Sequence, residues 1–190
     1  MKKLMLIVLS FFCMNFCFAD ETIILIRHAE KPTNGLGQLT CQGFNRALKL
    51  TSVLNQKFGK PDFIYAPNPG ELKNDKGTEY YYIRPLATIE PTAIRLGMPV
   101  NLKYSFLKHK EMTDELLQEK YKDSLIFVAW EHHLAAQITE DILTKLNGQS
   151  VKLKWEDEDF DSIYIISIKD GKATLKIDKQ NLNDQNKECN

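Results

Sequence analysis

The sequence predicts an α/β protein of three layers, in which helices cover both faces of a mostly parallel central sheet and an antiparallel hairpin ends the fold. Residues 22–26 and 125–130 are continuous apolar runs rich in β-branched side chains, which is typical of strands covered on both faces. Amphipathic helical segments alternate with the strands and imply crossover connections. Asp170-Gly171, between two apolar segments, is the strongest hairpin signal.

The composition fits one globular domain and excludes several classes of protein. The chain has 190 residues, of which 43% are hydrophobic, enough for a substantial core. Its 25 basic and 25 acidic side chains cancel, so it lacks the positive field of a protein that coats nucleic acid, and we expect no nucleic-acid partner. Seven Pro and nine Gly are too few for a disordered or collagen-like chain.

The N-terminus has the pattern of a secretory signal peptide. Lys2 and Lys3 precede an apolar run over residues 4–18, and the small residue Ala19 follows it. The run is shorter than the roughly 20 residues of a membrane span. We expect cleavage after Ala19, a single mature domain over residues 20–190, and a periplasmic or secreted location. An uncleaved N-terminal anchor is the alternative, and no later apolar segment is long enough to span a membrane.

Two of the four cysteines, Cys41 and Cys189, remain after this cleavage. In an oxidising compartment they either pair, which would attach the C-terminal tail to the first helix, or stay as free thiols. The sequence does not decide, because pairing requires a Cα separation of roughly 6 Å.

The first half of the mature chain begins with the strand over residues 22–26 and a loop over residues 31–38. A helix over residues 41–58 follows, with Thr40 as its N-cap and one apolar face at steps of three and four. A short strand covers residues 63–66. Residues 67–79 form a long polar connection, which is usually functional or mobile.

The second half begins with a helix over residues 85–96, with Pro85 in its first turn and Pro91 inside, where a kink is expected. A weaker helix covers residues 111–121. The strand over residues 125–130 leads into a helix that runs to about Leu146. The expected hairpin strands cover residues 163–168 and 173–177.

Two of the apolar strands lead into a histidine. Arg27 and His28 follow the first strand, and His132 follows the strand over residues 125–130. Ligands of α/β sheets bind beyond the carboxyl ends of the strands, so these side chains converge if the two strands are central, parallel neighbours.

Two imidazoles and a guanidinium suit phosphoryl transfer. A neutral imidazole can attack phosphorus and form a covalent intermediate. Arginine binds the equatorial phosphoryl oxygens in a bidentate manner and keeps its charge. Because cationic side chains can stabilise the transferred group, we expect no cofactor and no metal.

The residues in this order resemble the histidine phosphatase superfamily, which has the phosphoglycerate mutase-like fold. Residues 25–31, Leu-Ile-Arg-His-Ala-Glu-Lys, are similar to its Arg-His-Gly signature, with Ala29 in place of Gly. Residues 39–43 look like its Leu-Thr-x-x-Gly helix opening, Thr92-Ala93 like its Thr-Ala helix, and residues 130–132 like its second histidine motif. The resemblance covers residues 22–146 and suggests an exported bacterial-type member.

The resemblance implies roles for individual residues. His28 would be the phosphorylated nucleophile, Arg27 would bind phosphate, and His132 would stabilise the transferred group. The usual spacing of the family places a second arginine at the position of Thr88. Arg84 lies one helical turn earlier and is our preferred second phosphate ligand.

The general acid has no clear position, since it varies within the superfamily. The candidates are Glu131, Glu111 and Asp114, or an acidic residue of the connection over residues 67–79. Arg95 is a poorer candidate than Arg84 for the second arginine, because it follows Thr-Ala and would face elsewhere.

Several polar residues have a structural interpretation instead. His133 is expected to begin a helix in solvent, and adjacent histidines are poor joint metal ligands because neighbouring side chains diverge. Residues 157–161 are expected to form a solvated acidic turn, and Trp155 and Phe160 to pack on the sheet edge.

The predicted function is hydrolysis of a phosphomonoester through a phosphohistidine on His28, with Arg27, Arg84 and His132 forming the phosphate pocket. The partner would be a small phosphorylated substrate or a phosphoprotein. The alternative is a binding module that retains the anion pocket but has little or no catalytic activity. The sequence does not indicate the substrate or the oligomeric state.

Overall fold

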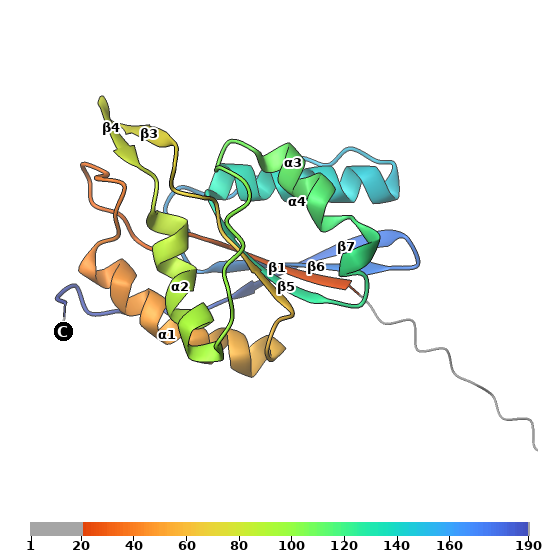
Figure 1. The fold of residues 1–190 in the computed structure, drawn as a ribbon, viewed down its shortest axis with the longest axis horizontal. Helices are drawn as coiled ribbons and strands as arrows, with labels where there is room; N and C mark the ends of the chain where they lie inside the picture. The colour runs from red at the N-terminus through yellow and green to blue at the C-terminus, as the bar shows by residue number, and fades with distance from the viewer. Residues whose placement is uncertain (1–20, 190) are drawn as a thin grey trace, which may run out of the picture.

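The computed structural model describes residues 21–189 and confirms the three-layer α/β architecture. Figure 1 shows a central sheet with helices on both of its faces and the hairpin β3–β4 projecting at one end. The expected signal peptide, residues 1–19, lies outside the described residues. None of the helices within residues 21–189 is long and apolar enough to cross a membrane.

The five-stranded sheet has the order β2-β5-β1-β6-β7. Its strands are β2 (Phe63–Tyr65), β5 (Leu125–Trp130), β1 (Glu21–Arg27), β6 (Ser162–Lys169) and β7 (Lys172–Lys179). The first three are parallel to one another, and β6 and β7 are antiparallel to their neighbours. The sheet is therefore mixed. β1 and β5 are parallel neighbours, and this is the arrangement that would bring together the histidines that follow these strands.

The predicted C-terminal hairpin is confirmed. Asp170 and Gly171 connect β6 to β7 with φ angles of 50° and 72°. Two successive residues with positive φ match the twist of the flanking strands, which is why Asp-Gly is favoured there.

Four helices in the described part of the chain cover the sheet: α1 (Cys41–Phe58), α2 (Arg84–Leu96), α3 (His109–Leu116) and α4 (His132–Asn147). Successive side chains of β1 point to opposite faces. Ile23 and Leu25 belong to the core cluster beneath α3 and α4, whereas Ile24 and Ile26 belong to the cluster beneath α1 and α2. Burial on both faces explains the unbroken apolar run of this strand.

Two predicted elements differ in the structure. The polar connection over residues 67–79 contains most of a hairpin formed by β3 (Leu72–Asp75) and β4 (Thr78–Tyr81), with the positive-φ turn Lys76-Gly77. Its strands are short and mostly exposed, so they lack an apolar pattern. The helix expected over residues 111–121 consists of α3 and a separate 3-10 turn, η1 (Glu119–Tyr121).

The helix α2 includes both of its prolines. Pro85 lies in the first turn. Backbone N–H groups of the first turn have no hydrogen-bond partner within the helix, so the N–H that proline lacks is not needed there. The helix continues through Pro91 and ends at Gly97, which has a φ of 62°. The expected kink therefore does not divide the helix.

Cys41 and Cys189 form a disulfide, with a Cα separation of 4.8 Å. The bond joins the first residue of α1 to the C-terminal tail. Side chains of α1 add to this attachment, because Gln42 donates to the carbonyl of Asn183 and Asn45 donates to the carbonyls of Asn186 and Glu188. The tail is thus bound along the first turns of α1.

We expect Cys189→Ser to lower the free energy of unfolding by about 2–5 kcal/mol, because a closed loop of this length restricts the unfolded chain strongly. Chemical denaturation of the oxidised protein and the variant measures this difference. Reduction of the wild type should produce the same loss, and equal stability of the oxidised and reduced wild type would contradict the prediction.

Candidate active site

The candidate site lies where β1 and β5 end side by side. Arg27 is opposite Trp130 in the sheet register, and the backbone N–H of His28 donates to the carbonyl of Trp130 at 3.1 Å. Glu131 then caps α4, and His132 is the first residue of that helix. The two predicted histidines therefore leave adjacent parallel strands at the same sheet edge, as expected.

A cavity of about 810 Å³ opens at this edge. Its lining includes Arg27, Lys31, Lys73, Asp75, Glu131, His132, His133, Asp157 and Phe160. His28 does not line the cavity and is only 2% exposed. The rings of Tyr82 and Phe160 lie 6.0 Å and 6.2 Å from its ring, so a ligand in the cavity reaches His28 only after the surrounding side chains move.

The tautomer of His28 follows from its hydrogen bond. Its Nδ1 lies 2.7 Å from the carbonyl oxygen of Ala29, which can only accept. Nδ1 therefore carries the proton and donates it, and in the neutral ring Nε2 keeps its lone pair. This is the atom that can attack an electrophile.

The surroundings of His28 keep its ring neutral. Burial lowers the pKa of His28 well below its ordinary value, and the charges of Arg27 and Arg84 lower it further. A neutral imidazole at ordinary pH is the form that a nucleophile requires.

This shift predicts a pH-dependent loss of stability. As pH falls below about 6.5, a histidine in the unfolded chain binds a proton while the native His28 stays neutral, so the unfolded state is favoured. The free energy of unfolding should fall by about 1.4 kcal/mol per pH unit more steeply in the wild type than in His28→Asn. Denaturation curves between pH 5 and pH 7 test this, and parallel slopes for the two proteins would refute it.

Arg27 is buried and fixed by the loop before β6. Its Nη1 donates to the carbonyls of Glu156, Asp157 and Asp159, at 2.7–3.1 Å, and its guanidinium lies 4.0 Å from the ring centroid of Phe160. All three hydrogen bonds use Nη1. The rest of the guanidinium remains available to a ligand.

Arg84 is fully buried at the start of α2 and forms a bidentate pair with Asp75 of β3. Its Nη1 and Nη2 lie 2.6 Å and 3.2 Å from the two carboxylate oxygens. Thr88, the position where the usual spacing places an arginine, accepts a hydrogen bond from the N–H of Ala29 at 2.9 Å. Arg84 and Thr88 lie one turn apart on one face of α2. The charge of Arg84 acts on His28, and Thr88 contacts the next residue, Ala29. Arg95 is exposed at the other end of α2.

His132 lies between two carboxylates. Its Nδ1 is 2.8 Å from Glu131 and its Nε2 is 2.7 Å from Asp157. The expectation that the adjacent imidazoles diverge is wrong, because the ring centroids of His132 and His133 lie 3.9 Å apart and Nε2 of His133 is 3.3 Å from the same Asp157 oxygen. Glu131, His132 and His133 offer three possible metal-ligand atoms within 4.8 Å of one another.

The predicted general acids are poorly suited to that role. Burial alone would raise the pKa of the Glu131 carboxyl, but His132 and the N–H of Leu134 lower it to about 2, so the group is ionised. Glu111 and Asp114 line no part of the cavity and pair with Lys108 and Lys145 on the surface.

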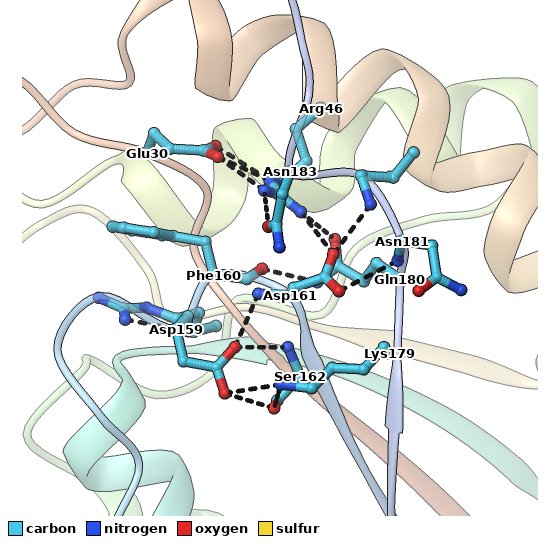
Figure 2. Close-up of polar contacts among 12 residues, drawn as sticks. Glu30, Arg46, Asp159, Phe160, Asp161, Ser162, Lys179, Gln180, Asn181 and Asn183 are labelled. Carbon is cyan, nitrogen blue, oxygen red and sulfur yellow. Dashed lines mark hydrogen bonds and ion pairs between the residues drawn. The ribbon is translucent and has the colours of Figure 1, made fainter.

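A buried arginine behind the site was missed as a functional residue. Arg46 of α1 is 1% exposed and forms ion pairs with Glu30, at 2.7 Å, and with Asp161, at 3.2 Å. Its guanidinium also donates to Gln180 and Asn183 (Figure 2). Arg46 therefore joins the His28 loop to the segment before β6 and to the C-terminal tail.

The solvated turn expected over residues 157–161 is confirmed at residues 157–158, which form an exposed turn, but residues 159–161 are partly or fully buried and hydrogen-bonded. The carboxylate of Asp159 accepts from Asp161, Ser162 and Lys179 (Figure 2). Asp161 is 5% exposed. Trp155 stacks on Tyr164 of the sheet as expected, at 4.1 Å, but Phe160 covers Arg27 instead. This ordered segment supplies the carbonyls that bind Arg27.

Three buried polar atoms around His28 have no hydrogen-bond partner within the described chain: Nε of Arg27, Nε of Arg84 and the hydroxyl of Tyr82. Each can donate, and an unsatisfied buried donor costs about 1–3 kcal/mol. Their arrangement around a neutral imidazole suits an anion.

The comparisons with known proteins give the fold. A scan against protein-family models finds no match, and a search of curated proteins also finds none. The search of solved structures finds the protein histidine phosphatase SixA complexed with tungstate, with 12% identity and a TM-score of 0.56, covering 84% of this chain and 97% of that one.

Two further matches are phosphatases. A phosphoserine phosphatase mutant from Entamoeba histolytica, in complex with phosphoserine, has 13% identity and a TM-score of 0.56, covering 85% of this chain and 98% of that one. A mycobacterial glucosyl-3-phosphoglycerate phosphatase has 11% identity and a TM-score of 0.53, covering 84% of this chain and 97% of that one. The chain therefore has the phosphoglycerate mutase-like fold.

Proposed function

We propose that the protein is a phosphomonoester hydrolase that acts through a phosphohistidine on His28. The observation that carries the proposal is the set of three unpartnered buried donors around a neutral imidazole whose Nε2 is free. The phosphatases with the same fold support it.

The proposed reaction has two displacements. Nε2 of His28 attacks phosphorus, and the bond from phosphorus to the ester oxygen breaks. Water then attacks the phosphohistidine, and the P–N bond breaks and returns its electron pair to Nε2. Arg27, Arg84 and His132 stabilise the charge on the equatorial oxygens in both steps. Because arginine and imidazole donors supply the stabilisation, the mechanism needs no metal, and activity should persist in a chelator.

The burial of His28 by the surrounding side chains favours a second candidate function. Because His28 is buried, side chains around it, such as Phe160, must move before a phosphoryl group reaches Nε2, and Asp157 must leave Nε2 of His132. A protein in which these movements do not occur would be a binding module for phosphate or phosphoesters, with little catalytic activity.

We propose an exported location, because the N-terminal pattern is that of a signal peptide and the Cys41–Cys189 disulfide suits an oxidising compartment. Substrates reachable there include phosphorylated envelope sugars, nucleotides and phosphoproteins. Water is the proposed acceptor.

The experiment is an assay of a panel of phosphate esters, with and without chelator, followed by acid-free quenching and mass analysis of the peptide that contains His28. Turnover with an acid-labile phosphate on His28 supports the enzyme. Saturable binding of phosphate or tungstate with no turnover across the panel would reject it in favour of the binding module.

A further inference from the structure

We propose that Tyr82 is a catalytic residue that donates the proton to the leaving-group oxygen when His28 is phosphorylated. The inference rests on the proposed function and adds the proton donor that no carboxylate of the site provides. Tyr82 links β4 to α2 and lies two residues before Arg84.

The ring of Tyr82 is fixed against His28. Its relative exposure is 0%, and it contacts the His28 ring edge-on at a centroid distance of 6.0 Å and an interplanar angle of 87°. The ring of Phe106 packs on it at 4.9 Å. Packing on both sides holds the phenol in one orientation beside the nucleophile.

The hydroxyl of Tyr82 meets no hydrogen-bond geometry with a partner within residues 21–189, and the neighbouring polar group that acts on it is the guanidinium of Arg84, which lowers its pKa against the effect of burial. A buried phenol usually finds a hydrogen-bond partner, because leaving it unpaired costs free energy. The missing partner is explained if the hydroxyl donates to a ligand oxygen. A purely structural tyrosine would be as well served by phenylalanine.

The carboxylates at the cavity cannot replace it as proton donors. Hydrogen bonds from Arg84 overcome the effect of burial and lower the pKa of Asp75, and a hydrogen bond from His132 lowers the pKa of Asp157. Glu131 is ionised for the reason given above. In contrast, burial raises the pKa of the Tyr82 phenol above its ordinary value, so it retains its proton.

Positive charge near the ring favours the phenolate that forms, because Arg84 and Arg27 lower the pKa of the phenol against the effect of burial. The Arg84 guanidinium lies 4.8 Å and the Lys73 ammonium 4.9 Å from the ring centroid of Tyr82. As the P–O bond breaks, the proton on the Tyr82 hydroxyl moves to the leaving oxygen, which departs as a neutral alcohol. In the second step the attacking water gives its proton to the phenolate, which restores the phenol. An aliphatic alkoxide is a stronger base than a phenolate, so the first transfer is favourable.

Tyr82→Phe tests the proposal with two substrates that differ in leaving group. We expect kcat/KM for an alkyl phosphate such as glycerol phosphate to fall by about 10²–10³-fold, the usual range for a general acid. For p-nitrophenyl phosphate, whose leaving group needs no proton, the loss should stay within about fivefold. Tyr81→Phe, a change at the exposed neighbouring tyrosine, is the control and should leave both rates unchanged.

The thermal midpoint of Tyr82→Phe should stay equal to or above that of the wild type, because the variant loses an unpaired hydroxyl. An equal loss for both esters, or no loss for either, would overturn the role of Tyr82 while leaving the phosphohistidine mechanism intact. A wild type that turns over neither ester would overturn both proposals.

Discussion

Replacement of His28 by Asn is expected to lower kcat for every phosphate ester by at least about 10³-fold, because it removes the nucleophilic Nε2. The amide of Asn can still donate to the carbonyl of Ala29, so the local hydrogen bond is kept. His28→Ala should lose as much activity and some stability, since it leaves a cavity at a buried position. Initial rates and thermal midpoints measure the two effects separately.

His109→Ala is the matched control. His109 begins α3 and does not line the cavity, and Nδ1 of its ring lies 3.3 Å from the carbonyl oxygen of Leu107. Its replacement should leave kcat unchanged. Retention of more than a tenth of the wild-type rate in folded His28→Asn would contradict the assignment of the nucleophile.

Arg46→Met is expected to destabilise the protein by about 3–5 kcal/mol, because it leaves the buried Asp161 and the partly buried Glu30 without their shared cation. The thermal midpoint should fall by about 10 °C for a chain of this size. At temperatures where the variant is folded, we also expect KM to rise, since Arg46 supports the segment whose carbonyls bind Arg27 (Figure 2).

Arg46→Lys should give an intermediate loss, because an ammonium keeps the charge but not the fork that binds several acceptors. Arg95→Met changes an exposed arginine on another helix and should alter stability by less than about 0.5 kcal/mol. A change below about 1 kcal/mol for Arg46→Met would show that the buried network contributes little.

Strands that are buried on both faces could be predicted, because they are continuous apolar runs in the sequence. The runs that became β1 and β5 show this, as does the turn at Asp170-Gly171, where the residue types match the backbone geometry. The hairpin β3–β4 was missed because its strands are short and exposed and carry polar residues. The only local signal for it was the Lys76-Gly77 turn.

Part of the candidate site could also be predicted from the sequence, because some of its residues directly follow the buried strands. Arg27, His28 and His132 follow buried strands, so the topology of the fold brings them to one sheet edge. Asp75, Asp157 and Tyr82 come from polar or irregular segments, and only the tertiary structure shows that they contact the arginines and histidines. The contacts of Arg46 could not be predicted either. Its position within a helix does not indicate that acidic and amide side chains from three segments lie around its guanidinium.

The most direct test of the account is the stereochemical course of hydrolysis at an isotopically chiral phosphorus. Two successive in-line displacements, first by the imidazole and then by water, predict net retention of configuration. Net inversion, which a single attack by water would produce, would contradict a covalent role for His28.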